Sequence, residues 1–409
     1  MNRILFISGL YSKELEPTFV ANSKSKSIQN APNVFQWALL AGLEDNGVNY
    51  TVHAYPFLSS YPIRYKRLVV NEGPIVYKGK DVGKSIAYLN VIGLKNISIK
   101  RKVSKGVKEW LLKESNGKNV VIVYSQLSYV LESLIRLKRD FDFEICVIVT
   151  DLIEDARNFP INRSPLKRLQ LHIEGRKQKK LFSSIDKYVL LSKYMRERIP
   201  ESTEKSIVIE GIADICQNNN SGGSKKSKDD SVKSLLYTGS LHPFSGIRDL
   251  IEAFRRTTNP SYRLIICGIG SEESYIIEQQ KYDKRIVFLG NISRDEAVNL
   301  QQTSSVLVNP RKPNGGITRF SFPSKTMEYL SSGTPMIGYY LEGIPDDYHP
   351  FIYSPKDMSV ESMTDEIEEM LSMSDEELMQ KGRMAYDFIK NNKTSKSQVA
   401  RIIDFVFNE

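Results

Sequence analysis

Short runs of apolar residues alternate with segments in which apolar residues recur at helical spacing. The apolar runs predict strands at 4–7, 50–54, 120–124, 145–150 and 188–191, and again at 234–237, 263–267, 286–289, 306–308 and 336–338. Between them, the spacing predicts helices that include 34–45, 247–255, 294–302 and 325–331. Strands that alternate with helices are typical of parallel sheets, so the sequence predicts an α/β fold.

A polar segment divides this pattern in two. Residues 217–231 are rich in Asn, Gly, Ser, Lys and Asp, and such a composition cannot bury a core. Because 409 residues also exceed one ordinary domain, we expect two Rossmann-like, doubly wound domains that face each other across a cleft. The predicted limits are an N-terminal domain at 1–214, a flexible linker at 215–232, a second domain at 233–392 and a C-terminal amphipathic helix at 393–409.

The composition excludes several classes of protein. No run of 18 apolar residues occurs, which argues against a membrane span, and the first apolar stretch breaks at Ser8 and Gly9 like a strand rather than a leader peptide. The three cysteines are scattered and the four histidines lack metal-ligand spacing. We therefore expect a cytoplasmic protein with no bound metal and no cofactor.

Charge is distributed unevenly along the chain. Residues 1–200 carry fifteen more basic than acidic residues, whereas the remainder carries six more acidic than basic ones. Basic segments at 100–113 and 164–180, with Trp110, Leu111 and Leu112 in the first, favour an anionic membrane surface as a partner. The alternative is ordinary charged helix faces, with Leu166, Leu169 and Ile173 packing the second helix. Basic and aromatic residues do not interleave, so we predict no nucleic-acid partner.

The strongest chemical pattern lies after the strand at 306–308. Asn309, Pro310 and Arg311 lead into a Gly-rich loop, and a helix opens near Pro323 and Ser324. The amides of a helix N-terminus attract anions, and Lys325 adds a full positive charge. Glu328 follows one turn later, where its carboxylate can accept hydrogen bonds from vicinal sugar hydroxyls. The string therefore predicts a site for a nucleoside diphosphate, with a surface Lys–Glu pair as the alternative reading.

Residues 234–340 resemble the family-4-like retaining glycosyltransferases, the glycosyl transferases group 1. Besides the string that ends in Ser324, Lys325 and Glu328, the resemblance rests on motifs in the family's order. They are Leu236-Tyr237-Thr238-Gly239-Ser240, Ile251-Glu252-Ala253-Phe254, Ile266-Cys267-Gly268-Ile269-Gly270 and Val287-Phe288-Leu289-Gly290. The resemblance implies a GT-B architecture, and it implies that the last helix returns to the N-terminal domain.

The resemblance also implies roles for individual residues. Glu328 would bind the donor ribose, and the Ser324–Lys325 segment would bind the diphosphate of a UDP- or GDP-sugar. Three positions depart from the family pattern: Phe320 replaces an earlier Glu, while Ser240 and Ser245 replace Arg and Lys. Arg311 and Arg319 are candidates to supply the missing positive charge. The predicted donor-binding residues are Gly9, Gly239, Ser240, Gly268, Arg311, Arg319, Ser324, Lys325 and Glu328.

Two residues of the N-terminal half are further candidates. Gly9 follows the first strand, where it either lets the backbone approach a ligand or forms a simple turn. Asp151 follows the strand at 145–150, next to Glu154 and Asp155, and is predicted to be a general base or else a helix cap. With Glu328, Asp151 completes the predicted catalytic pair.

We expect transfer with retention to a glycan or a lipid-pyrophosphate-linked acceptor in cell-surface polysaccharide synthesis. The enzyme would work at the cytoplasmic face of a membrane. The departures at Phe320, Ser240 and Ser245 leave open a non-catalytic GT-B protein that binds a nucleotide or a partner of the polysaccharide machinery. An epimerase that acts on the sugar nucleotide itself is the other alternative.

Overall fold

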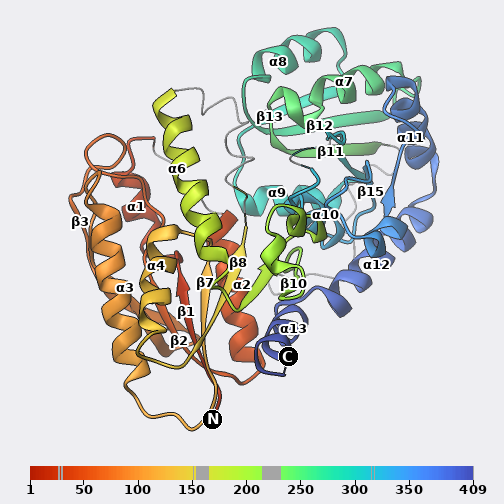
Figure 1. The fold of residues 1–409 in the computed structure, drawn as a ribbon. Helices are drawn as coiled ribbons and strands as arrows, with labels where there is room; N and C mark the ends of the chain where they lie inside the picture. Colours follow the sequence, from red (N-terminus) through yellow and green to blue (C-terminus); the bar gives the residue numbers. More distant parts are fainter. Residues whose placement is uncertain are drawn as a thin grey trace. The chain divides into compact units, whose positions relative to one another are not determined.

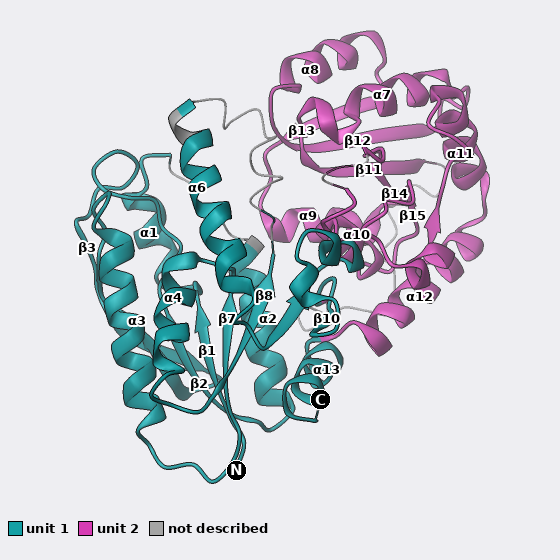
Figure 2. Cartoon of the chain, viewed as in Figure 1, with its two compact units in different colours: residues 1–212, 395–409 teal, residues 213–394 magenta. Residues whose placement is uncertain are grey.

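The computed structural model describes residues 1–25, 28, 31–150, 152, 165–213, 232–314, 316 and 318–408. It divides into two compact units, which Figures 1 and 2 show: unit 1 comprises Met1–Ile212 and Ser395–Glu409, and unit 2 comprises Ala213–Thr394. Most of the predicted linker, residues 215–231, lies outside the described residues. No described helix is both long and apolar enough to cross a membrane.

Unit 1 is built on an eight-stranded sheet in the order β10-β9-β8-β7-β1-β2-β5-β4. Its strands are β1 (Arg3–Ser8), β2 (Asn49–Ala54), β4 (Gly73–Tyr77), β5 (Lys80–Ser85), β7 (Asn119–Tyr124), β8 (Glu144–Val149), β9 (Lys187–Leu190) and β10 (Ser206–Val208). All neighbours pair in parallel except β4 with β5. The chain passes from β1 to β2 on one side and later resumes at β7 on the other. This reversal makes the carboxyl ends of β1 and β7 a topological switch point.

The helices of unit 1 cover this sheet. They are α1 (Glu16–Asn22), α2 (Ala31–Asp45), α3 (Lys95–Leu111), α4 (Ser128–Leu137), α6 (Pro165–Phe182) and α13 (Ser395–Asn408), with short 3-10 turns η2 (Lys193–Glu197) and η3 (Pro200–Ser202). The last helix packs on α2 so closely that a Cβ at Gly42 would lie 2.3 Å from the Ser395 carbonyl oxygen. Gln398 Nε2 also donates to the Gly211 carbonyl at 3.1 Å. The end of the chain thus completes the fold of its beginning.

Unit 2 contains a six-stranded, wholly parallel sheet in the order β13-β12-β11-β14-β15-β16. The strands are β11 (Lys233–Ser240), β12 (Tyr262–Ile269), β13 (Ile286–Gly290), β14 (Val306–Asn309), β15 (Met336–Gly338) and β16 (Ile352–Tyr353). The helices are η4 (Pro243–Ser245), α7 (Ile247–Arg256), α8 (Glu273–Tyr282), α9 (Arg294–Thr303), α10 (Ser324–Leu330), η5 (Asp346–Phe351), α11 (Val360–Ser372) and α12 (Asp375–Asn392). Here the switch point lies between β11 and β14.

The predicted strands and helices are confirmed, but the segment 59–97 was not predicted to form strands. It contains the antiparallel pair β3 (Val69–Val70) and β6 (Tyr88–Leu89) besides β5 and the edge strand β4. The strands β3 and β6 have two residues each, β5 is mostly polar, and β4 begins with Gly and Pro, so no long apolar run marks them.

Two expectations about the basic helices are wrong. Trp110 is buried, with the guanidinium of Arg3 4.3 Å from its ring centroid, so it cannot contact a membrane. On α6, Leu169 and Ile173 are exposed rather than packed into the core. The side chain of Leu166 lies outside the described residues.

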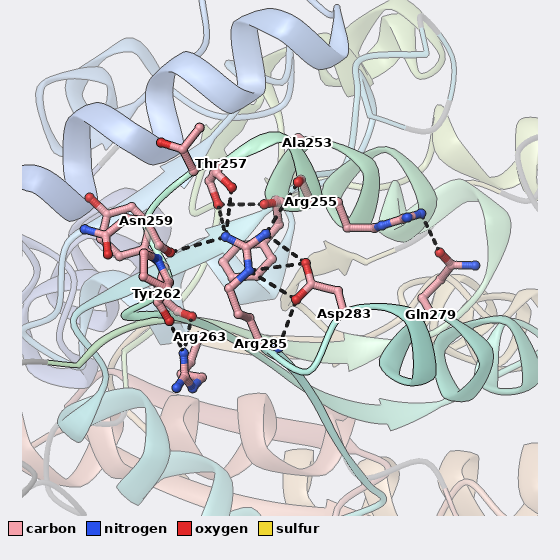
Figure 3. A network of polar contacts seen from close by, with 12 residues as sticks. Ala253, Arg255, Thr257, Asn259, Tyr262, Arg263, Gln279, Asp283 and Arg285 are labelled. Carbon is pink, nitrogen blue, oxygen red and sulfur yellow. Dashed lines mark hydrogen bonds and ion pairs between the residues drawn. The ribbon is translucent and has the colours of Figure 1, made fainter.

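Arg285 forms a network of polar contacts at the amino end of the unit 2 sheet, where β12 and β13 begin (Figure 3). Its guanidinium forms an ion pair with Asp283 at 2.8 Å and donates to the carbonyl oxygens of Thr257 at 2.8 Å and Asn259 at 3.3 Å. The same group lies 5.0 Å from the ring centroid of Phe254. One side chain therefore ties the end of α7 to the starts of two strands.

Candidate functional site

A polar cluster occupies the switch point at the carboxyl end of the unit 2 sheet. Thr238 stands near the end of β11, and three side chains from other elements reach its hydroxyl: Gln301 Nε2 at 3.0 Å, Lys325 Nζ at 3.3 Å and Tyr329 Oη at 3.2 Å. Gln301 comes from α9, and Lys325 and Tyr329 come from α10. The cluster therefore joins one strand end to two helices.

Glu328 is the acceptor of this cluster. Its Oε1 accepts from Gln301 Nε2 at 2.5 Å and from Lys325 Nζ at 3.0 Å, while its Oε2 accepts from the same ammonium at 3.0 Å. The Glu328 side chain is 38% exposed and that of Lys325 is 32% exposed. A carboxylate has about four lone-pair positions, so Glu328 keeps acceptor capacity toward solvent. The carboxylate is oriented from one side and open on the other.

Tyr329 explains why α10 holds these groups in place. The tyrosine is fully buried, and its hydroxyl accepts from the Thr238 amide at 2.9 Å and donates to the Thr238 carbonyl oxygen at 3.1 Å. Burial raises the pKa of Tyr329 above its usual range, so the hydroxyl stays neutral and keeps its proton for this bond. The helix is thereby fixed to β11 one residue after Glu328.

Arg311 brings a poorly solvated positive charge to the same end of β14. Its Nε atom is buried and has no hydrogen-bond partner among the residues that the structure describes. Burial lowers the pKa of the guanidinium, although the group remains charged. A buried donor without a partner costs free energy that a bound anion would recover.

The predicted glycines serve close packing. Gly239 and Gly268 pair across β11 and β12, and Gly268 has a φ of 144°. A Cβ at Gly268 would lie 1.8 Å from the Gly239 carbonyl oxygen, so no side chain fits there. In unit 1, the Gly9 amide donates to Gln36 Oε1 at 2.6 Å, and a Cβ at Gly9 would lie 2.5 Å from the Phe57 ring. Gly9 thus packs against its own unit.

The remaining predicted residues occupy varied positions. Ser240 is exposed at the end of β11, and its carbonyl oxygen accepts from Tyr237 Oη at 2.8 Å. Ser324 is exposed at the first position of α10, where no side chain of the described residues caps the helix. The Arg319 amide donates to the Gly316 carbonyl oxygen at 3.2 Å, and its side chain is half-buried. Asp151 lies outside the described residues.

The three departures from the family pattern have structural counterparts. Phe320 is buried, so a buried apolar side chain occupies the position of the missing Glu. Ser245 is also buried, and its hydroxyl donates to the His242 carbonyl oxygen at 2.6 Å within η4. Ser240, the third departure, is exposed at the end of β11.

Sequence reasoning missed Thr238 and Gln301. Thr238 lies inside the motif between Tyr237 and Gly239, so its place at the strand end was a usable signal. Gln301 gave none, because α9 carries several polar side chains and their spacing does not reveal which one is turned inward. Gln301 is only 1% exposed, which marks it as part of the cluster.

Residues 232–373 match the family described as glycosyl transferases group 1. No curated protein sequence matches the chain. Among solved structures, sucrose-phosphate synthase from Thermosynechococcus elongatus is 12% identical with a TM-score of 0.63, and the similarity covers 99% of this chain and 98% of that one. The lipopolysaccharide outer core galactosyltransferase WaaB is 14% identical with a TM-score of 0.60, over 100% and 99% of the two chains. HepE of Anabaena, in complex with UDP and glucose, is 14% identical with a TM-score of 0.54, over 100% of both chains.

Proposed function

We propose that this chain, a glycosyltransferase of GT-B fold whose residues 232–373 belong to the glycosyl transferases group 1, uses a UDP- or GDP-sugar as donor. The observation that carries the proposal is the cluster at the end of β11. There Glu328 is held by Gln301 and Lys325 with acceptor capacity toward solvent. An oriented, half-exposed carboxylate beside a cation matches the vicinal hydroxyls and the phosphates of a nucleoside diphosphate.

Each group has a proposed role. Glu328 accepts hydrogen bonds from the donor ribose, and Lys325 and Arg311 neutralise the diphosphate. As the bond between the sugar and the phosphate breaks, negative charge grows on the leaving diphosphate, and both cations stabilise that charge most in the transition state. Because these side chains supply the positive charge, we expect no requirement for a metal ion.

The finer assignments belong to the same proposal. Retention of the anomeric configuration rests on the family resemblance. The acceptor is proposed to be a glycan or a lipid-pyrophosphate-linked glycan in cell-surface polysaccharide synthesis, a setting supported by the name of the similar galactosyltransferase WaaB. Asp151 remains a predicted general base, and Asp151→Asn is expected to lower the transfer rate without changing nucleotide affinity.

The first experiment is thermal unfolding of the purified chain with UDP, GDP, ADP or CMP, each with and without Mg²⁺. UDP comes first because the similar HepE structure holds UDP and glucose. A ligand at 100 times its dissociation constant should add about 2.7 kcal/mol of stability. A metal-independent shift with one diphosphate identifies the donor class. Binding without transfer or donor hydrolysis would favour the non-catalytic alternative, and a new sugar nucleotide formed without acceptor would favour the epimerase.

We further propose that unit 1 docks on an anionic membrane surface through an apolar patch. The patch consists of side chains that are 44–66% exposed, namely Ile63, Leu68, Val69, Ile92, Leu94 and Ile97. The patch residues come from two segments of the chain, 61–69 and 90–97. Hydrogen bonds join these segments, from the Asn90 amide to the Leu68 carbonyl oxygen at 2.7 Å and from the Tyr61 amide to the Asn90 carbonyl oxygen at 2.8 Å.

Basic residues border this patch, which fits a surface that combines acyl chains with anionic headgroups. Arg64, Lys66 and Arg67 are exposed in the first segment, and α3 continues from the second with exposed basic side chains at Arg101, Lys102, Lys105 and Lys108. The patch therefore replaces Trp110 as the apolar component of the predicted membrane contact.

Co-sedimentation with vesicles tests the patch. Vesicles that contain phosphatidylglycerol should bind the chain, and pure phosphatidylcholine vesicles should not. The double variant Ile92→Glu/Leu94→Glu should lose binding, whereas Met384→Glu, a matched change at an exposed apolar residue of unit 2, should keep it. Equal binding by both variants would refute the patch.

A further inference from the structure

Unit 1 contains a pocket at its own switch point, separate from the cluster in unit 2. The pocket has a volume of about 510 Å³, within the range of ligand sites. Its wall includes Phe57 and Leu58, which follow β2, and Ser125 and Leu127, which follow β7. Helices α3 and α4, which lie side by side in Figure 1, supply Lys95 and Tyr129. Carboxyl ends of strands at a switch point are where doubly wound sheets bind ligands.

Aromatic rings form much of the pocket wall. Phe57 and Tyr129 are half-buried, Tyr55 and Tyr65 are buried, and all four line the pocket. Phe57 is held by a stacked contact with Tyr124, with ring centroids 6.1 Å apart. Rigid rings lose little conformational entropy when they cover a ligand, and they suit flat, partly apolar faces such as those of a sugar ring.

Lys95 is the one charged side chain among the pocket-lining residues that the structure describes. Its ammonium donates to the Leu58 carbonyl oxygen and lies 5.6 Å from the centroid of the Tyr88 ring. No described carboxylate forms an ion pair with it, and burial lowers its pKa to about 8. The pocket therefore carries a desolvated positive charge that nothing within the described chain neutralises.

Two further features indicate a place for a polar ligand. Tyr55 is 1% exposed, and its hydroxyl has no hydrogen-bond partner among the described residues. Such a buried orphan hydroxyl costs free energy unless a ligand or water reaches it. Ser125 has a φ of 75°, a left-handed conformation that non-glycine residues rarely adopt and that clusters at binding sites. Both residues line the pocket.

We propose that this pocket binds an acidic sugar ring of the acceptor, with Lys95 contacting its carboxylate or phosphate and Phe57 and Tyr129 covering its ring. The inference rests on the proposed function, because it places the acceptor of the same transfer reaction. It adds that the acceptor is anionic near the site of transfer, whereas a neutral sugar would leave the Lys95 ammonium unpaired.

The test uses saturation-transfer NMR titrations of the full chain with glucuronate, glucose 6-phosphate and neutral glucose. The two acidic sugars separate a carboxylate from a phosphate preference. We expect at least one acidic sugar to bind about 10-fold or more tightly than glucose. Lys95→Met should remove that preference, Lys95→Arg should retain most of it, and Lys102→Met, an exposed lysine of the same helix, should change nothing.

Equal affinity for glucose and both acidic sugars would overturn the inference, as would a preference that survives Lys95→Met. Thermal shifts with UDP and GDP on the same samples separate this failure from a failure of the proposed function. If the nucleotide shift is present and the acidic preference is absent, only the pocket assignment fails. If the acidic preference depends on Lys95 and no nucleotide binds, the pocket stands and the donor proposal fails.

Discussion

The two ends of the parallel sheet in unit 2 use similar residue types to opposite effect. At the amino end, Arg285 and Asp283 have side chains 17% and 14% exposed, and the guanidinium is bonded to carboxylate, carbonyl and hydroxyl oxygens (Figure 3). At the carboxyl end, Lys325 and Glu328 form a pair about twice as exposed, and Arg311 Nε lacks a described partner.

The comparison teaches how a structural ion pair differs from a ligand site. A saturated network has no hydrogen-bonding capacity left for a ligand, so it can only hold the fold. A cluster that is held by buried hydrogen bonds and keeps hydrogen-bonding capacity toward solvent has a fixed geometry and can still bind a ligand. Substitutions at the amino end should therefore lower the stability of the protein, and substitutions at the carboxyl end should lower its activity.

The largest effect should follow from Glu328→Ala. Removing hydrogen bonds from two hydroxyls to a carboxylate, at about 1.5–3 kcal/mol each, should lower the transfer rate roughly 10²- to 10⁴-fold. Initial rates with the cognate donor measure this loss, and the unfolding temperature should stay close to that of the wild type. A variant that keeps full activity would remove Glu328 from the donor site.

Next in size is Arg285→Met at the other end of the sheet. It leaves the half-buried Asp283 without its partner, which should cost about 1–3 kcal/mol of unfolding free energy. Urea titration measures the loss, and nucleotide affinity of the folded protein should persist. The matched control is Arg263→Met, because the half-buried Arg263 donates to the carbonyl oxygens of Pro260 and Tyr262 and forms no ion pair with a described residue. If both substitutions lower the unfolding free energy equally, the Arg285 network does not stabilise the amino end of the sheet.

Arg311→Met should lower nucleotide affinity without lowering stability, the reverse of the effect expected for Arg285→Met. Affinity for the nucleoside diphosphate should fall roughly 10- to 100-fold, since one desolvated charge-assisted contact is lost. The unfolding free energy should hold or rise, because a buried unpaired donor is replaced by an apolar chain of similar length. Calorimetric titration with the diphosphate gives the affinity. A large loss of stability would show instead that Arg311 holds the fold.

The smallest predicted effect concerns pH. The Arg285 side chain holds the pKa of Asp283 below its usual range. The contribution of this carboxylate is therefore fully present above its unfolded pKa, near 4, and is lost as the pH falls through the lower folded value. Unfolding free energies of the wild type and Asp283→Asn should converge as the pH is lowered through this range. If the two curves of unfolding free energy against pH stay parallel, the pKa of Asp283 is not lowered in the folded protein.

The fold could be predicted from the sequence wherever one face or both faces of an element are buried. Strands such as β7 and β8 are continuous apolar runs because they are covered on both sides. The edge strand β4 and its neighbour β5 have mostly half-buried or exposed residues, with Gly and Lys among them, and their pairing depends on neighbours that no local pattern reveals. The predicted GT-B fold is confirmed by the similar structures, and residues 232–373 match the predicted family of glycosyl transferases group 1.

The candidate site was predictable only in part. Lys325 and Glu328 stand one turn apart in a short segment, so their proximity followed from helical spacing. Gln301 and Thr238 join them from positions 24 or more residues away along the chain, and only the packing of α9 and α10 on β11 brings them together. Trp110 was wrongly predicted to be exposed for the same reason, because the residue that it packs against, Arg3, belongs to a strand over a hundred residues earlier.

The docking of α13 on α2 has a consequence for how the protein is made. The two parts of unit 1 lie on either side of unit 2 in the sequence, and Val399, Ile402 and Val406 of α13 fill its core beside Leu39 and Leu43. Until α13 has been synthesised, the face of α2 around Gly42 lacks its cover, while unit 2 already has its whole sequence. The nascent chain should therefore complete unit 2 before unit 1, and deletion of α13 should destabilise unit 1, most of which is synthesised earlier.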